Sequence, residues 1–534
     1  MLQLPMRNRM LLVFRDWRRL LPQCNAGWLG AASILFVLIC CHTANGAEAT
    51  SQNPAAPVAK PNLVIINIDD LGYADIGPFG SVTNRTPNLD RMAKEGRRLT
   101  SFYAAPVCSP SRAALMTGCY PKRVLPIPHV LFPANDHGLS PDELTVAEVL
   151  KAAGYATGMV GKWHLGDQPE FLPNRQGFDS WLGLPYSNDM GPAQDGVKSD
   201  LGKPLPQPKG KGQPPLPLLR DGKVIRRVLP NDQQSLVELY TTEAIHFIQQ
   251  NKQRPFFLYL AHNAVHFPIY PGPKWAGRSP HGIYSDWVEE VDWSVGRVLD
   301  TLRELGLSER TLVLFTSDNG GTPRGSNLPL RGYKGSTWEG GVRVCTIAWW
   351  PGKIPAGTSS DAITGMFDVL PTFAALAGAE IPKDRKIDGA NIWPVLAGIP
   401  NTTPPHDTFY YYRGLRLEAV RQGDWKLRLP DAPQAARNPA AQGQAPRQPR
   451  GAGAAASSKP RLYNLKTDIG ETTDVADANP QIVAKLQALI DAMKNDLGLD
   501  GIGPGCRPLG KVANPAPIID FNGQIRKDCA PSNP

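Results

Sequence analysis

The sequence contains no internal repeat and no segment that is apolar over 18 residues, and both absences limit what the protein can be. Without such an apolar segment we expect no helix that spans a bilayer. The 51 glycines and 53 prolines follow no Gly-X-Y period, which excludes collagen. Charged residues make up only 20% of the chain and hydrophobic residues 42%, which excludes a disordered polyelectrolyte and is sufficient for a large core.

Positive charge is in modest excess and is concentrated in three segments. The formal net charge is +9, and residues 1–47, 191–230 and 431–460 together carry more than the whole of this excess. The remainder of the chain is slightly acidic and has no basic stripe interleaved with aromatic residues. Because nucleic acids bind to stripes of that kind, we expect no nucleic-acid partner.

The first 47 residues have the pattern of a secretory signal peptide. Arginines gather in residues 7–19, an apolar run occupies residues 28–41, and small residues follow. The run is shorter than the ~20 residues that a helix needs to cross a bilayer. We therefore expect cleavage near Gly46 or Ala47 and export of a soluble mature chain to the periplasm, the extracellular space or an equivalent compartment. An uncleaved N-terminal anchor is the alternative.

Five of the eight cysteines remain after such a cleavage. An odd number in an exported chain leaves at least one thiol unpaired or chemically special. Cys506 and Cys529 flank a Gly/Pro-rich stretch of the tail at residues 501–534, and they either form a disulfide or stay free. The other three are Cys108, Cys119 and Cys345.

The hydrophobic pattern that follows a Pro/Ala linker at residues 48–61 predicts a large α/β domain over residues 62–405. Residues 62–68 are a continuous apolar run, which is typical of a strand buried on both faces. Residues 284–305 place apolar side chains at spacings of three and four, which indicates a helix. Strands that alternate with helices along the chain predict a mostly parallel sheet between two layers of helices. The other strands are expected at 256–260, 311–316 and 344–350, and the other helices at 87–99, 111–117 and 144–153.

From about residue 408 the pattern changes to short β-rich pieces separated by glycine turns. These pieces predict a small antiparallel sheet, and with a helix over 480–497 they form an expected C-terminal subdomain at 406–500. Two segments of biased composition interrupt the domains. Residues 191–230 are a Pro/Lys-rich insertion in the large domain, and residues 431–459 are expected to be a disordered loop.

Polar side chains follow two of the expected buried strands. Asp69 and Asp70 come after the first strand, and Asp318 and Asn319 follow the strand at 311–316. Parallel strands bring their carboxyl ends to one edge of a sheet, and carboxylates gathered there repel one another unless a cation lies between them. Oxygen ligands favour calcium or magnesium over zinc. Capping of helices and turns is the simpler interpretation of either pair alone.

Residues 108–118, CSPSRAALMTG, match C-x-P-S-R-x-x-x-x-T-G, the signature of the formylglycine-dependent sulfatases. The chain resembles this family over about residues 60–400, most closely the arylsulfatase A and N-acetylgalactosamine-6-sulfatase branch. The resemblance implies an alkaline-phosphatase-like fold and hydrolysis of a sulfate ester to an alcohol and inorganic sulfate. Further segments that match in the family's order are 62–73, 86–90, 161–166, 266–268, 317–320 and 332–341, and residues 188–190 indicate the branch.

The resemblance also implies a matured nucleophile and a metal ion. A formylglycine-generating enzyme, which reads Pro110 and Arg112, would oxidise Cys108 to an aldehyde whose hydrate attacks sulfur. Loss of the proton of its second hydroxyl would then expel sulfate without attack by water. A buried structural thiol is the alternative for Cys108. Calcium, with magnesium as the alternative, would be held by Asp69, Asp70, Cys108, Asp318 and Asn319.

The basic residues receive roles from the same resemblance. Lys162 and Lys334 would bind sulfate oxygens, and Arg112 would hold the hydrated nucleophile through charge-assisted hydrogen bonds. His164 would be the base that removes the proton of the second hydroxyl, and His266 would protonate the departing alcohol. The simpler interpretation of each is an exposed lysine or a satisfied core histidine.

Two other functions stay open at this point. A phosphodiesterase or phosphonate monoester hydrolase of the same superfamily would keep the metal ligands and lysines. A non-catalytic carbohydrate-binding relative would lose a metal or nucleophile position. His262 and His266, four residues apart, could also be interpreted as a zinc pair. The expected substrate is a sulfated carbohydrate, to which the basic segment 191–230 is suited by charge, or an aryl sulfate.

Overall fold

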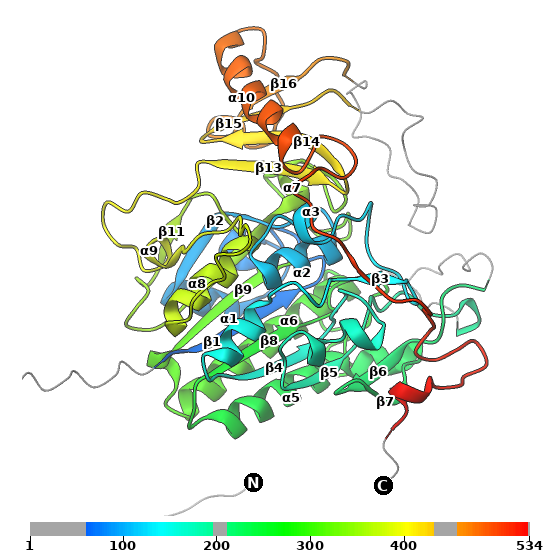
Figure 1. The fold of residues 1–534 in the computed structure, drawn as a ribbon. Coiled ribbons are helices and arrows are strands. Elements are labelled where there is room, and N and C mark those ends of the chain that lie inside the picture. The colour runs from blue at the N-terminus through cyan, green and yellow to red at the C-terminus, as the bar shows by residue number, and fades with distance from the viewer. Residues whose placement is uncertain (1–59, 196–210, 432–456, 532–534) are drawn as a thin grey trace, which may run out of the picture. The chain divides into compact units, whose positions relative to one another are not determined.

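The computed structural model describes residues 60–195, 211–431 and 457–531, all within the unit Ala59–Pro534 (Figure 1). The centre of this unit is one sheet with helices on both faces, which is called the large sheet below. Its strands in chain order are β1 (Asn62–Ile68), β2 (Arg97–Tyr103), β4 (Ala156–Gly161), β5 (Ser180–Gly183), β6 (Pro217–Arg220), β7 (Lys223–Arg227), β8 (Phe256–Ala261), β9 (Thr311–Ser317), β10 (Arg343–Trp349), β11 (Thr358–Ser360) and β12 (Thr364–Gly365).

The large sheet has the order β11-β2-β10-β9-β1-β8-β4-β5-β6-β7, and β12 pairs with β2. The five neighbours β9, β1, β8, β4 and β5 are parallel. β10 runs antiparallel between β9 and β2, and the β6–β7 hairpin continues the opposite edge in antiparallel fashion. The predicted α/β class is confirmed, with a mixed sheet whose parallel block lies in the middle.

Two groups of helices cover the faces of the large sheet. Leu63 and Ile65 of β1 point into a core shared with α2, α4 and α8, while Val64 and Ile66 point into a core shared with α1, α5 and α6. Because both faces are covered, the residues of β1 from Leu63 to Ile66 are all apolar. The helices are α1 (Pro87–Glu95), α2 (Cys108–Thr117), α3 (Pro121–Val124), α4 (Val146–Ala152), α5 (Leu236–Asn251), α6 (Ile283–Glu304), α7 (Glu339–Val342), α8 (Val369–Ala377) and α9 (Trp393–Leu396).

Two segments differ from the sequence-based expectation. The helix expected over 87–99 ends at Glu95, and Arg97–Tyr103 becomes β2 because β10 on one side and β11 and β12 on the other offer backbone partners. Part of the 191–230 insertion also forms the hairpin β6–β7. Its turn at Asp221 and Gly222 has φ values of 50° and 81°, the positive pair that a two-residue type I′ turn requires.

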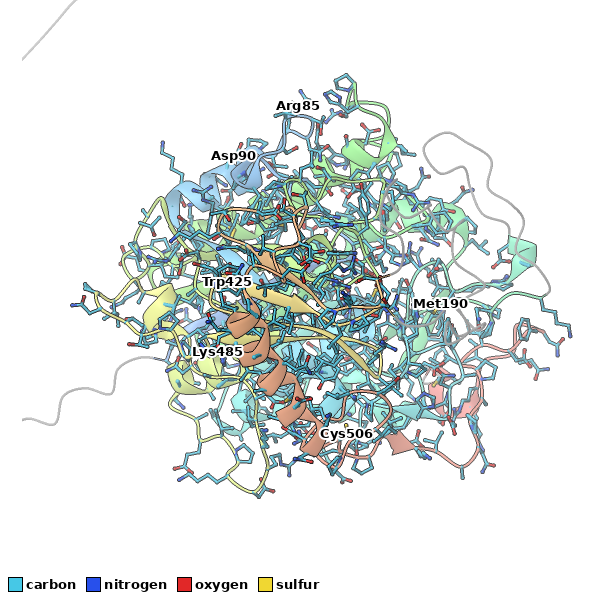
Figure 2. All side chains as sticks on the ribbon, turned by 90° about the horizontal axis from the view of Figure 1, so that it is seen from above. Arg85, Asp90, Met190, Trp425, Lys485 and Cys506 are labelled. Atoms are coloured by element: carbon cyan, nitrogen blue, oxygen red, sulfur yellow. The ribbon has the colours of Figure 1, made fainter. Side chains whose placement is uncertain are left out.

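The C-terminal pieces form the predicted antiparallel sheet, called the small sheet below. It consists of β13 (Thr408–Arg413), β14 (Arg416–Gln422), β15 (Trp425–Arg428) and β16 (Arg461–Asn464), paired in chain order. Helix α10 (Pro480–Ala492) packs against β14 and β15; Figure 2 labels Lys485 on α10 and Trp425 on β15. In the tail, β17 (Gly510–Lys511) pairs with β3 (His137–Gly138), which ties the C-terminal stretch to the large domain.

Several expectations fall on residues outside the described ranges, namely the leader 1–47, almost all of the linker and most of the loop 431–459. Cys506 and Cys529 are free thiols, as are the other three cysteines of the described chain. None of the helices in the described ranges combines the length and the apolarity that a bilayer crossing requires.

Candidate active site

The polar residues at two strand ends meet at one edge of the large sheet. β1 and β9 are parallel neighbours with Ile68 opposite Ser317, so the residues that follow each strand lie side by side. Asn319 Nδ2 donates to Asp70 Oδ1 at 2.8 Å, and the backbone N–H of Asp70 donates to Asp318 Oδ1 at 3.3 Å. The predicted gathering of these side chains is therefore what the register of the parallel strands produces.

Helix α2 points its first residue into this edge. Cys108 begins the helix and is buried, with its Sγ 3.3 Å from Asp69 Oδ1. One turn later Arg112 donates to Asp318 Oδ2 from Nε at 3.0 Å and Nη2 at 2.8 Å. Residues i and i+4 share one face of a helix, so α2 presents the thiol and the guanidinium to the same site. A helix N-terminus also favours an anion there.

Two lysines balance the remaining carboxylates. Lys162 follows β4, is fully buried, and its Nζ pairs closely with Asp69 Oδ2. Lys334 comes from a long connection after β9, with its Nζ 2.6 Å from Asp70 Oδ1 and 3.4 Å from Cys108 Sγ. Buried charges are stable only when they are paired, so each lysine is held by the acid that it faces.

Two histidines complete the group. His164 Nε2 donates to the carbonyl of Leu131 at 3.0 Å, which leaves its buried Nδ1 without a hydrogen-bond partner. Burial, together with Lys162, holds the pKa of His164 well below its ordinary value. His266 Nδ1 donates to the carbonyl of Phe267 at 2.5 Å, and its Nε2 lies 3.8 Å from Asp70 Oδ2.

Nine of the ten predicted site residues are joined by hydrogen bonds or ion pairs, and the tenth, His164, interacts electrostatically with Lys162, Arg112 and Asp69. We call the ten residues the strand-end cluster. Most of its side chains are fully buried, whereas His266 is 9% exposed and the Lys334 side chain 14%, so the opening lies on their side. Its members are Asp69, Asp70, Cys108, Arg112, Lys162, His164, His266, Asp318, Asn319 and Lys334.

The strand-end cluster offers ligands for a metal ion. Single ligand atoms of Asp69, Asp70, Cys108 and His266 all lie within 4.8 Å of one another, so these residues could hold a cation. The sequence had indicated Asp318 and Asn319, and not His266, as the further ligands, and Asp318 lies outside this group of atoms. Asn319 lies beside this group, and its buried Oδ1 has no hydrogen-bond partner in the protein. An orphaned buried oxygen next to carboxylates is what a site for an oxygen-binding cation would present.

One residue of the site was not predicted. Ser187 Oγ lies 3.2 Å from Lys162 Nζ and 3.4 Å from both ring nitrogens of His266, so it bridges the two sides of the opening. Ser187 lies directly before the segment 188–190, which indicated the branch of the family. This position was the only signal in the sequence that could have identified Ser187. His262, by contrast, contacts Ser294 of α6 through Nε2 at 3.0 Å, and no zinc pair with His266 forms.

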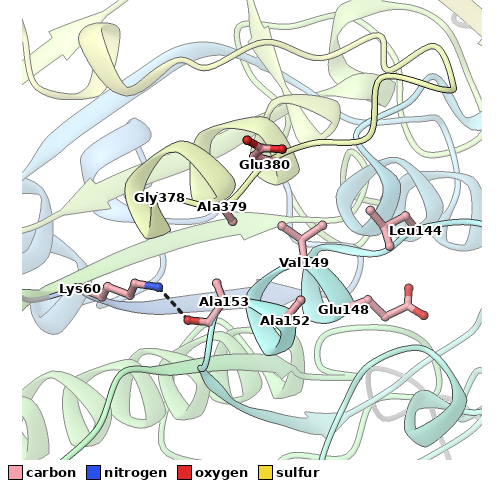
Figure 3. A pocket seen from close by; sticks show the side chains of 9 residues that line it. All are labelled: Lys60, Leu144, Glu148, Val149, Ala152, Ala153, Gly378, Ala379 and Glu380. Carbon is pink, nitrogen blue, oxygen red and sulfur yellow. Dashed lines mark hydrogen bonds between the residues drawn. The ribbon is translucent and has the colours of Figure 1, made fainter.

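A separate groove of about 500 Å³ lies between α4 and the end of α8 (Figure 3). Lys60 Nζ donates to the carbonyl of Ala153 at 2.8 Å across it, and Glu148 belongs to the capping box of α4. Lys60 and Glu148 are therefore used by the fold, and the groove contains no member of the strand-end cluster. The lining residues are Lys60, Leu144, Glu148, Val149, Ala152, Ala153, Gly378, Ala379 and Glu380.

Comparison with known proteins agrees with this geometry. The family model described as Sulfatase matches residues 61–379, and that for the C-terminal region of aryl-sulfatase matches residues 404–500. Human arylsulfatase A is 40% identical over 453 residues, which cover 81% of this chain and 88% of that protein. The N-acetylgalactosamine-6-sulfatase of Canis lupus familiaris is 40% identical over 407 residues, 71% of this chain and 73% of that protein.

Among solved structures, the PsFucS1 sulfatase from Pseudoalteromonas sp. superimposes with a TM-score of 0.68 at 29% identity, covering 84% of this chain and 92% of that chain. These matches do not favour a phosphodiesterase, a phosphonate monoester hydrolase or a non-catalytic binding protein. The chain belongs to the sulfatase family of the formylglycine type, and it is an enzyme that hydrolyses sulfate esters.

Proposed function

We propose that the enzyme acts on a sulfated carbohydrate or an aryl sulfate and uses Cys108, matured to formylglycine, as its nucleophile. The observation that carries this proposal is the position of Cys108 Sγ at the buried start of α2, 3.3 Å from Asp69 Oδ1 and 3.4 Å from Lys334 Nζ. The relatives named N-acetylgalactosamine-6-sulfatase and arylsulfatase A support the two substrate classes. A formylglycine-generating enzyme is the maturation partner that follows from the C-x-P-S-R motif.

The metal ion that we propose is calcium, with magnesium as the alternative, because the donors are mostly carboxylate and amide oxygens. Asp69, Asp70, Asp318, Asn319 and residue 108 would hold it, with His266 close by. When bound, the cation supplies positive charge that polarises the sulfate group, and the formylglycine hydrate supplies the attacking hydroxyl.

The protein's own charges prepare the site for an anion. Three carboxylates, Asp69, Asp70 and Asp318, are matched by three permanent cations, which pair with them in the order Lys162, Lys334 and Arg112. A divalent cation added to this balanced set leaves net positive charge, which attracts a sulfate ester. Lys162 and Lys334 would then donate hydrogen bonds to sulfate oxygens, where charge develops in the transition state.

The two histidines would move protons at defined atoms. His164 already donates from Nε2 to Leu131, so Nδ1 is the nitrogen that would accept the proton of the second hydroxyl. His266 donates from Nδ1 to the carbonyl of Phe267, so Nε2 would protonate the departing alcohol oxygen. Its 9% exposure places it at the opening, where the alcohol part of the substrate leaves.

A panel assay tests this function. Purified enzyme from a host that matures the motif should hydrolyse nitrophenyl sulfate and sulfated mono- and disaccharides at least ~100-fold faster than the matching phosphate esters. The reason is that the proposed site is complementary to the charge and geometry of a sulfate ester. The panel also identifies the preferred sugar position. Faster hydrolysis of the phosphate esters would mean that the proposed substrate class is wrong.

We also propose that the enzyme is exported after removal of residues 1–47. The support is the order of arginines, apolar run and small residues in that leader. N-terminal sequencing of protein recovered from outside the cytoplasm should begin just after Gly46 or Ala47. An intact Met1 on the exported protein would instead indicate an uncleaved anchor.

A further inference from the structure

The segment 331–341 connects the strand-end cluster to the small sheet. At its start, Lys334 Nζ reaches Asp70 and Cys108, while the backbone N–H of Gly335 donates to the carbonyl of Pro106 at 2.8 Å. Residues 318–338 contain no helix or strand, so no regular structure holds this connection in place. Its position therefore depends on contacts from other parts of the fold.

Lys426 of β15 makes the most concentrated of these contacts. Its side chain is fully buried, and Nζ donates to the carbonyl of Thr337 at 2.9 Å and to Glu339 Oε1 at 2.8 Å. Nζ also pairs with Glu471 Oε1 at 2.8 Å. The ammonium thus makes two hydrogen bonds to the segment 331–341 and an ion pair with Glu471. In Figure 1, α7, which begins at Glu339, lies directly beneath the small sheet.

Further groups of the C-terminal subdomain hold the same residues. Arg428 Nη1 donates to the carbonyl of Thr337 at 2.9 Å, and the Thr337 hydroxyl donates to Glu418 Oε2 at 2.6 Å. The backbone N–H of Glu339 donates to Glu471 Oε2 at 2.7 Å. Residues 337–339, which follow Lys334 closely in the chain, are thus held by side chains from the small sheet and from the segment after β16.

We propose that Lys426 is a positioning residue for sulfate-ester cleavage, which holds the segment 331–341 so that Lys334 Nζ lies at the reacting atom. This inference rests on the role of Lys334 in the proposed function. A displacement of about 1 Å at a catalytic group can reduce the rate ~100-fold, so a support outside the site can matter for turnover. The small sheet would then be part of the catalytic apparatus without touching the substrate.

The test compares Lys426→Met with Leu427→Ala, a neighbour on β15 that is equally buried but belongs to the hydrophobic core. With nitrophenyl sulfate, Lys426→Met should lower kcat about 10- to 100-fold and change KM less than 3-fold. Leu427→Ala should lower the melting temperature but leave kcat of the folded enzyme within about 2-fold of wild type. If both variants lower kcat equally at temperatures where both are folded, the effect is general loosening and the proposal is wrong.

A double-mutant cycle separates action through Lys334 from an independent effect. In a Lys334→Ala background, Lys426→Met should lower the residual kcat by less than about 3-fold, because the group that it positions is gone. A full additional loss would overturn the proposal. If Lys334→Ala alone keeps wild-type kcat, the role of Lys334 in the proposed function fails. If Lys334→Ala is inactive but Lys426→Met is not, only the present inference fails.

Thr337→Val keeps the test decisive if Lys426→Met does not fold. This change removes the hydroxyl that donates to Glu418 but retains the size of the side chain and the Lys426 contacts. We expect kcat to fall about 3- to 10-fold with circular dichroism unchanged, and the loss to disappear in the Lys334→Ala background. An equal loss in both backgrounds would contradict the proposal, because the position of this segment would then not act through Lys334.

Discussion

Two buried groups of charged residues lie at the two ends of the segment 331–341, and they satisfy their polar atoms differently. In the strand-end cluster, Asn319 Oδ1 and His164 Nδ1 are buried without hydrogen-bond partners in the protein. The second group, the interface cluster, consists of Glu339, Lys426 and Glu471. There, Glu339 accepts hydrogen bonds from Lys426 and Tyr411 at Oε1 and from Tyr103 at Oε2, at 2.6 to 2.8 Å.

In both groups the pKa of one carboxyl is raised and that of another is lowered. The raised ones are Asp318 in the strand-end cluster and Glu471 in the interface cluster, and the lowered ones are Asp69 and Glu339. Burial and the neighbouring Asp69 raise the pKa of Asp318 to about 6. Burial acts in the same direction on Glu339, but Lys426 and two arginines outweigh it and hold the pKa of Glu339 well below its ordinary value. The strand-end cluster thus keeps polar atoms available for ligands. In the interface cluster Glu471 Oε1 also lacks a hydrogen bond, but it lies 2.8 Å from the Lys426 ammonium and is paired within the fold.

The largest effect should come from removing the nucleophile of the strand-end cluster. Cys108→Ala should lower kcat by at least about 10⁴-fold, because no other group can form the covalent intermediate. Its melting temperature should stay close to that of wild type. In active wild-type enzyme, peptide mapping should find the Cys108 peptide about 18 Da lighter than its thiol form. Active enzyme with only unmodified Cys108 would disprove the mechanism.

Metal removal should also affect the strand-end cluster selectively. Exhaustive chelation should abolish turnover and lower the melting temperature, and calcium should restore both, because an ion that binds only the folded state stabilises it. Asp69→Ala should be inactive and should no longer respond to added calcium. Undiminished activity after verified metal removal would show that the strand-end carboxylates are structural.

The two histidines should respond differently to the leaving group. His266→Ala should lose about 10²–10³-fold in kcat/KM on a sugar sulfate, but less than 10-fold on nitrophenyl sulfate, whose phenolate leaves without a proton. His164→Ala should release a burst of alcohol and then stall, with sulfate trapped on residue 108. Equal losses on both substrates and no trapped adduct would show that the two roles are wrongly assigned.

In the interface cluster the expected change is in stability. Glu339→Gln removes a buried charge that Lys426 needs, and should cost about 2–4 kcal/mol at neutral pH in urea unfolding. Because the folded pKa of Glu339 is depressed, its contribution is present above the unfolded pKa of ~4.3 and is lost as pH falls toward the folded value. The difference between variant and wild type should therefore shrink below about pH 4.

The exposed Glu304 on α6 provides the matched control for that measurement. Glu304→Gln should change the unfolding free energy by less than about 0.5 kcal/mol at either pH, as is usual for surface substitutions. A constant difference between wild type and Glu339→Gln from pH 7 to pH 3 would show that the charge of Glu339 does not stabilise the fold.

Local sequence patterns were sufficient where one element carries the whole signal. The apolar run 62–68 predicted β1 and the position of Asp69 at its end, because a strand buried on both faces has no polar alternation. The predicted helix at 111–117 contained Arg112 but not Cys108. The structure begins α2 at Cys108, and helix geometry then gives the two side chains a common direction. The motif at residues 108–118 also identified the family, because its residues and their spacing can be read directly from the sequence.

Other features depended on which distant segments meet. The helical pattern at residues 87–99 was overridden from Arg97 onward because β10 and β11 supply strand partners there. Ser187 was found only because β4, β5 and the loop that carries His266 converge at one edge.

The sequence alone determined the sulfatase family, the α/β class, the parallel core and the residues of the strand-end cluster, since each rests on apolar runs and motifs that are local in the chain. Only the tertiary structure decided the antiparallel β10, the β6–β7 hairpin and the support of Lys334 by Lys426. Glu339 and Lys426 are 87 residues apart in the chain and meet within 2.8 Å. The packing of the two sheets brings them together, and no local periodicity or motif encodes that packing.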